Sequence, residues 1–362
     1  MKHWQETSHI VDRIRRLGRQ GGSAALAVVT RVEGSAYRRP GAKLLIEAEG
    51  PTLGGISGGC LEEDVRQVGL EVIRSGRSRV LRYDTSDDEA RVWGLGLGCD
   101  GRVEVLVQPI SREAASGPWA RVRRLLQGDS PFALSLIVEE DGRGEVVSVG
   151  PSGCVAGGRG EKAADAAIEA AASAALRDRA TRLEPVGSRL VFTEVLLPPP
   201  RLLVCGAGND ARPLVSFAAA AGFRVFVADH RAAHLATRLF PDAWKLLPLR
   251  PEELSQEVLL DRDTCAVVKT HSLKQDTEWV RRLAGTDAFY IGILGPRKRT
   301  MKILADLRIE GDERIFGPVG LDLGADGPEQ VALSVVAELL AVRARREPRH
   351  LRVRESPVHA TR

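Results

Sequence analysis

The chain has 362 residues, of which 43% are apolar and 28% charged, a composition typical of a globular protein with two or three domains. Its 52 basic and 48 acidic residues leave a net charge of +4, and the basic residues lack interleaved aromatic side chains, so we expect no nucleic-acid partner. No apolar run approaches the roughly 18 residues that a membrane span needs, so we expect no membrane association.

The first half of the chain predicts a mixed α+β domain. Apolar residues at helical spacing predict helices over residues 3–18, 61–75 and 161–177. Apolar, β-branched runs predict strands over residues 24–32, 42–47, 80–83, 102–108 and 188–197. Residues 131–139 and 144–149 predict a hairpin, within a region where the signals are weakest.

Three consecutive prolines, Pro198-Pro199-Pro200, cannot join a helix or a central strand, and we interpret them as a linker. They divide the chain into an N-terminal domain over residues 1–197 and a second domain over residues 201–346. A basic tail follows over residues 347–362.

The second domain alternates regularly between strands and helices. Strands are predicted over residues 202–205, 224–228, 266–270 and 288–294, and helices over residues 210–221, 276–283, 297–307 and 328–345. This alternation predicts an α/β fold in which a doubly wound parallel sheet of Rossmann type forms the C-terminal domain.

A glycine-rich turn, Gly206-Ala207-Gly208, lies between the first strand and the first helix of that domain, and Asp229 closes the next strand. The glycines permit the close approach of a pyrophosphate, the helix N-terminus offers N–H donors, and an acid at this spacing suits a ribose hydroxyl. The pattern predicts the Rossmann fold. It leaves the ligand open, because this fold hosts many ligands besides NAD(P) and some such domains bind none.

Two further groups follow later strands and are expected at the same carboxyl edge of the sheet. They are Thr270-His271 and Gly295-Pro296-Arg297. The imidazole of His271 is suited to donate to a bound anion, and Arg297 is suited to clamp a phosphate. The alternative is a structural role for both groups: a histidine whose hydrogen bonds are satisfied within the fold, and a basic turn that faces solvent.

Two glycine-dense loops of the N-terminal domain each carry a thiol, Cys60 and Cys99. Cys60 heads a predicted helix, whose positive dipole end favours the thiolate, so both are candidates for a soft metal centre or for sulfur transfer. The alternative is a small side chain that fills a turn. The chain has five cysteines and no CxxC pair, which indicates reduced thiols and a cytoplasmic location.

The segments that carry a family resemblance include Gly54-Gly-Ile-Ser-Gly-Gly-Cys60-Leu-Glu62 and Tyr290-Ile-Gly-Ile-Leu-Gly295-Pro-Arg297. The others are residues 28–35, 39–43, 96–106, 206–211, 229–231, 240–243, 270–271, 318–324 and 328–338. Taken in this order, they resemble the XdhC/CoxI family of xanthine dehydrogenase accessory proteins. The sequence departs from the family pattern at Asn209, where histidine is usual, and at Asp100, where glycine or asparagine is common.

The resemblance implies a maturation factor rather than an enzyme. Such a protein binds the molybdenum cofactor, as molybdopterin or its nucleotide form, and protects it. It then delivers the cofactor to a xanthine dehydrogenase-like molybdoenzyme, often after sulfuration by a cysteine desulfurase. The phosphate end of the cofactor is expected at the glycine-rich turn and its metal end at Cys60 and Cys99. The implied cofactor-binding residues are Ser57, Gly58, Gly59, Cys60, Glu62, Cys99, Gly206, Gly208, Asp229, Arg231, His271, Gly295 and Arg297.

Two other functions stay open on the sequence. One is an NAD(P)-dependent oxidoreductase, with Asp229 on the ribose and His271 as the acid. The other is a scaffold that docks the target enzyme and holds no cofactor. The sequence also does not decide between a monomer and a homodimer.

Overall fold

The computed structural model describes residues 2–34, 36–84, 101–111, 115–150, 153–155 and 162–354. The chain forms two compact units, Lys2–Pro198 and Pro199–Val353. Within the described residues, every helix is either too short or too polar to cross a membrane.

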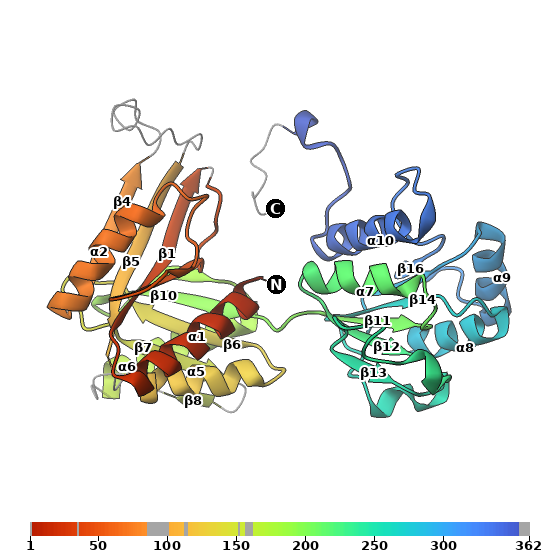
Figure 1. The fold of residues 1–362 in the computed structure, drawn as a ribbon, viewed down its shortest axis with the longest axis horizontal. Helices are drawn as coiled ribbons and strands as arrows, with labels where there is room; N and C mark the ends of the chain where they lie inside the picture. The colour runs from red at the N-terminus through yellow and green to blue at the C-terminus, as the bar shows by residue number, and fades with distance from the viewer. Residues whose placement is uncertain are drawn as a thin grey trace. The chain divides into compact units, whose positions relative to one another are not determined.

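The first unit contains two antiparallel sheets of five strands each (Figure 1). One sheet has the order β3-β2-β1-β5-β4, formed by β1 (Ala24–Gly34), β2 (Lys43–Glu47), β3 (Leu53–Gly54), β4 (Arg79–Asp84) and β5 (Gly101–Ile110). The other has the order β8-β7-β6-β10-β9, formed by β6 (Phe132–Ile137), β7 (Val146–Gly150), β8 (Gly153–Val155), β9 (Arg182–Val186) and β10 (Arg189–Leu196).

Alternate residues of β1 face two different cores, as the period of two in a strand requires. Leu26 and Val28 join a core that includes α1 (Lys2–Gln20), α5 (Pro118–Gln127) and residues of both sheets. Ala25, Ala27 and Val29 join a second core beneath α2 (Glu62–Ser75). On the other sheet, α6 (Lys162–Asp178) packs against β6, β7 and β10. Helices therefore cover both sheets.

The second unit is a six-stranded parallel sheet of order β13-β12-β11-β14-β15-β16. Its strands are β11 (Arg201–Cys205), β12 (Arg224–Ala228), β13 (Lys245–Leu247), β14 (Thr264–Val268), β15 (Tyr290–Ile293) and β16 (Ile315–Phe316). One face packs against α7 (Ala211–Ala220) and α10 (Gly327–Arg343), and the other against α8 (Leu273–Ala284) and α9 (Arg297–Leu307) (Figure 1). Short 3₁₀ helices cover Ala232–His234, Pro251–Gln256 and Leu351–Val353.

The strand order reverses between β11 and β14, which is the arrangement of a Rossmann fold. This confirms the predicted fold class. Ligands of open parallel sheets bind at such a reversal, outside the carboxyl ends of the strands. A binding site is therefore expected at the turn after β11 and the segment after β14.

Candidate functional site

The glycine-rich turn leaves β11 at Gly206, whose φ of +118° lies in the region that favours glycine. Its N–H donates to the carbonyl of Ala228 at 2.8 Å. A side chain here would place its Cβ 2.6 Å from the carbonyl oxygen of Lys269, on the segment that follows β14. Glycine is required because two strand ends and the turn meet at this point.

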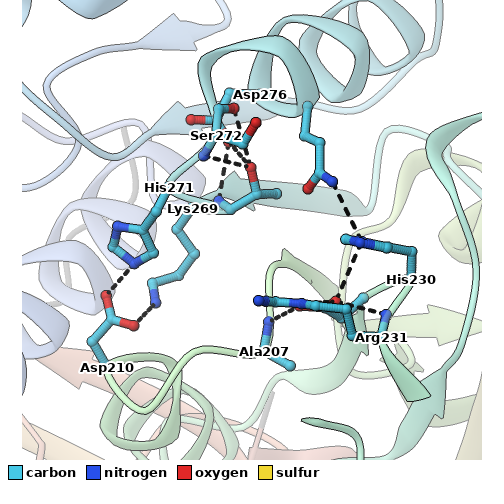
Figure 2. A network of polar contacts seen from close by, with 11 residues as sticks. Ala207, Asp210, His230, Arg231, Lys269, His271, Ser272 and Asp276 are labelled. Atoms are coloured by element: carbon cyan, nitrogen blue, oxygen red, sulfur yellow. Dashed lines mark hydrogen bonds and ion pairs between the residues drawn. The ribbon is translucent and has the colours of Figure 1, made fainter. Parts of the chain in front are cut away.

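Asp229, the predicted ribose ligand, is engaged by its own chain. One carboxylate oxygen accepts from the N–H of Ala207 at 2.9 Å and from Nη2 of Arg231 at 2.8 Å. The other accepts from the N–H and Nε of Arg231 at 2.9 and 3.0 Å (Figure 2). Burial raises the pKa of Asp229, but these bonds outweigh it and hold the pKa well below its usual range. The carboxylate therefore fastens the turn to the end of β12.

A pocket of about 680 Å³ opens beside Gly206 at the carboxyl edge of the sheet. This is the size of a site for a small molecule or a cofactor. Its walls combine polar and apolar surface and carry both signs of charge. They come from the turn, the end of β12, the segment before the second 3₁₀ helix, and α8. The lining residues include Asp229, His230, Arg250, Glu252, Thr270, Ser272, Lys274, Gln275, Glu278 and Arg281.

A second polar cluster lies where α7 begins. The carboxylate of Asp210 contacts Nζ of Lys269 at 2.8 Å and Nε2 of His271 at 3.1 Å. Lys269 is 3% exposed, and burial lowers the pKa of its ammonium, an effect that Asp210 offsets only in part. His271 has a φ of +60°, which is uncommon for a residue with a side chain. The carboxyl ends of β11 and β14 thus bring together an acid and two basic groups.

Asp276, on the first turn of α8, is fully buried and fixes the segment after β14. It accepts from the N–H and the hydroxyl of Thr270, at 3.0 and 2.5 Å, and it pairs with Arg299. The predicted phosphate clamp, Arg297, lies two residues before Arg299. Arg299 has a structural partner, whereas Arg297 is exposed at the start of α9 after Gly295, whose φ is +133°.

In the first unit, Glu62 organises the loop that precedes α2. Its carboxylate accepts from the N–H groups of Ile56 and Ser57, at 3.1 and 2.8 Å, and from the Ser57 hydroxyl. The Ser57 oxygen in turn accepts from the N–H of Gly59 at 3.1 Å and lies 3.4 Å from the exposed thiol of Cys60. Burial raises the pKa of Glu62, but these bonds lower it below the usual range. The loop holds the thiol at the surface.

The sequence-predicted residues fall into two groups. Gly206, Gly208, Asp229, Arg231 and His271 gather at the carboxyl edge of the parallel sheet, while Gly295 and Arg297 follow β15. The loop residues Ser57, Gly58, Gly59, Cys60 and Glu62 belong to the other unit. Cys99 lies outside the described residues. In the parts of the chain that the structure describes, no group of three or more His, Cys, Asp or Glu side chains forms a metal site.

Sequence reasoning missed Asp210 and Lys269. The sequence held one signal for Lys269. A lysine directly after the buried apolar run Cys265-Ala-Val-Val268 is unusual, because lysine is rarely buried unless it is paired. The buried pair of Lys43 and Glu194 was also missed, with Nζ 2.6 Å from the carboxylate.

Comparison with known proteins identifies the family. Residues 17–84 match the model of the XdhC and CoxI family, and residues 202–339 match the model of the XdhC Rossmann domain. A relative from Bacillus subtilis (strain 168), described as a probable xanthine dehydrogenase subunit, is 32% identical over 322 residues, which cover 89% of this chain and 94% of the relative. The chain belongs to the XdhC and CoxI family.

Two further relatives extend over almost the full length. The "Molybdenum cofactor insertion chaperone PaoD" of Escherichia coli (strain K12) is 25% identical over 362 residues, covering 96% of this chain and 94% of that one. A crystal structure described as a xanthine dehydrogenase from Bacillus halodurans superposes with a TM-score of 0.77 at 29% identity, covering 93% of this chain and 96% of its own.

Proposed function

We propose that this member of the XdhC and CoxI family binds the molybdenum cofactor, protects it and delivers it to a xanthine dehydrogenase-like molybdoenzyme. The observation that carries the proposal is the pocket beside the glycine-rich turn, with polar groups of both charges in its wall, in a chain whose relatives are named for xanthine dehydrogenase and for cofactor insertion.

The pocket suits a phosphate-bearing pterin as cargo. A fused heterocycle with several ring nitrogens and oxygens needs hydrogen-bonding walls, which Thr270, Ser272 and Gln275 supply. The phosphate end needs cations and backbone N–H groups, which the basic residues of the wall and the turn at Gly206 supply. The exposed thiol of Cys60, held beside Ser57 in the first unit, is a separate candidate for contact with a soft metal.

The test is to express the full chain in a cell that makes the cofactor and to purify it without oxygen. Oxidation of bound pterin to its fluorescent form measures the stoichiometry, and addition to a cofactor-free molybdoenzyme measures delivery. We expect bound pterin and activation of the enzyme. Protein that carries no pterin under these conditions would overturn the proposal. Cys60→Ala tests the thiol separately, because unchanged retention and unchanged activation would remove it from the mechanism.

The geometry of Asp229 argues against the dehydrogenase alternative, since both oxygens already accept bonds from Ala207 and Arg231. A ribose would have to displace a charged partner. Saturable binding of NADH with turnover would nevertheless favour that alternative. Co-purification with the molybdoenzyme in the absence of any pterin would favour a docking scaffold.

A further inference from the structure

The open face of Gly208 is filled by the protein itself. In a Rossmann turn, the second glycine leaves room for the backbone to approach a pyrophosphate. Here a Cβ on Gly208 would lie 2.6 Å from Oδ1 of Asp210 and 3.8 Å from Nε2 of His271. The Asp210 carboxylate therefore occupies the space that the glycine leaves free.

Two basic side chains converge on this carboxylate, one on each oxygen (Figure 2). Nζ of Lys269 lies 2.8 Å from one oxygen, and Nε2 of His271 lies 3.1 Å from the other. Lys269 is almost completely buried, and its ammonium retains hydrogen-bonding capacity that no described residue satisfies with good geometry. One carboxylate thus compensates the buried charge incompletely.

Asp210 is free to leave this position. It precedes α7, but its side chain makes no capping hydrogen bond to that helix. Its side chain is 31% exposed, so water can solvate the carboxylate after a rotation. Lys269 is less free, because it is buried and directly follows β14, whereas the side chain of His271 is 65% exposed and can follow a ligand.

We propose that this cluster is a phosphate site held closed by the chain's own carboxylate. Asp210 stands where a phosphate of the ligand binds, and Lys269 and His271 contact that phosphate once Asp210 has turned away. A phosphate brings more negative charge and more acceptor oxygens than a carboxylate, so it satisfies the buried ammonium better. The competing carboxylate weakens binding and assists release, as a carrier of cargo requires. This inference rests on the proposed function for the identity of the cargo.

The test uses inorganic pyrophosphate as the probe, titrated calorimetrically into the full chain. Asp210→Asn removes the competing charge and should tighten binding about tenfold, which corresponds to about 1.4 kcal/mol. The matched control is Asp242→Asn, which removes the same charge from an exposed position of the same unit and should leave the affinity unchanged. Equal affinities for Asp210→Asn and the control would overturn the proposal.

Lys269→Gln gives a second criterion, which does not depend on how well the Asp210 variant folds. It removes a buried charge while keeping a polar chain, and it should abolish the binding of pyrophosphate. Pyrophosphate binding at the wild-type affinity would exclude Lys269 as the phosphate ligand and overturn the proposal.

The outcomes separate this inference from the proposed function. Bound pterin in the wild type, together with an unchanged pyrophosphate affinity in Asp210→Asn, would refute the closed phosphate site alone. Tighter pyrophosphate binding in Asp210→Asn, without any retained pterin, would refute the cofactor proposal alone.

Discussion

Lys43→Met breaks a buried ion pair that joins two distant strands of the first unit. Lys43 and Glu194 are 1% and 2% exposed, and Nζ donates to the carboxylate at 2.6 Å and to the carbonyl of Gly41 at 2.9 Å. The second carboxylate oxygen lies 3.1 Å from Nδ1 of His3. Methionine keeps an unbranched apolar side chain, one heavy atom shorter, and removes the charge and the donors.

The expected cost is large, because the substitution leaves a buried carboxylate without its main counter-charge. Removing one partner of a buried pair costs about 3–5 kcal/mol. In a domain of roughly 150–250 residues each kcal/mol lowers the melting temperature by about 2–4 °C, so we expect a drop of roughly 6–20 °C. The double variant Lys43→Met/Glu194→Gln removes the orphaned charge and should recover most of this loss.

The pH dependence of stability provides an independent test, because the wild type and the variant should respond to pH in opposite directions. In the wild type, burial raises the pKa of Glu194, but Lys43 and His3 outweigh it and the pKa is lowered. This carboxylate therefore stabilises the fold above its unfolded pKa of about 4.3, and the contribution is lost as the pH falls through the folded value. Without Lys43, burial raises the pKa instead, so the variant should lose stability as the pH rises above about 4.

Scanning calorimetry of the full chain measures the shift, and hydrogen exchange of peptides from β2 and β10 assigns it to this unit. The matched control is Lys245→Met. Its pair with Glu257 has nearly the same length, 2.7 Å, but both side chains are about half exposed. That variant should cost less than about 1 kcal/mol. Equal shifts for the two lysine variants would refute the argument that burial decides the cost.

Two other substitutions test the glycine-rich turn and the thiol loop. Gly206→Ala should destabilise the second unit by about 3 kcal/mol or more, because it combines a positive φ with a backbone clash, whereas Gly187→Ala, with a φ of +62° and no atom within 4 Å, should cost about 1 kcal/mol. Equal melting temperatures would contradict this. Ser57→Ala removes a hydrogen bond that lowers the pKa of Glu62. It should cost about 1–2 kcal/mol at pH 7, and in thermal melts the difference should shrink as the pH falls through the lowered folded pKa of Glu62. A difference that does not change with pH would assign the loss to packing and to the other hydrogen bonds of Ser57 instead.

The sequence determined the elements whose apolar pattern is long and clearly bounded. The helix predicted over residues 297–307 is α9, and the hairpin predicted from residues 131–149 is the antiparallel pair of β6 and β7. The short strands were missed. β13 and β16 have three and two residues and form only because a neighbouring strand pairs with them. β9 contains Pro185, which a strand tolerates at the edge of a sheet.

Helix α5 shows a different limit of prediction from the sequence. Its signals are present in the sequence, since a proline stands at its first position and Trp119, Val122 and Leu126 recur at helical spacing. The helix falls in the region where the sequence signals are weakest. Only its burial against α1, in the core that both sheets share, makes its role plain.

At the candidate site, the sequence by itself determined the turn at Gly206 and its neighbour Asp229, because the Rossmann pattern is local and its residues lie at characteristic spacings. Only the tertiary structure decided that Asp229 binds its own turn and that Asp210 meets Lys269. The first contact depends on β11 and β12 lying side by side, and the second on β11 and β14. Local periodicity encodes a strand and its buried faces, whereas the order of strands in the sheet decides which side chains converge at its edge.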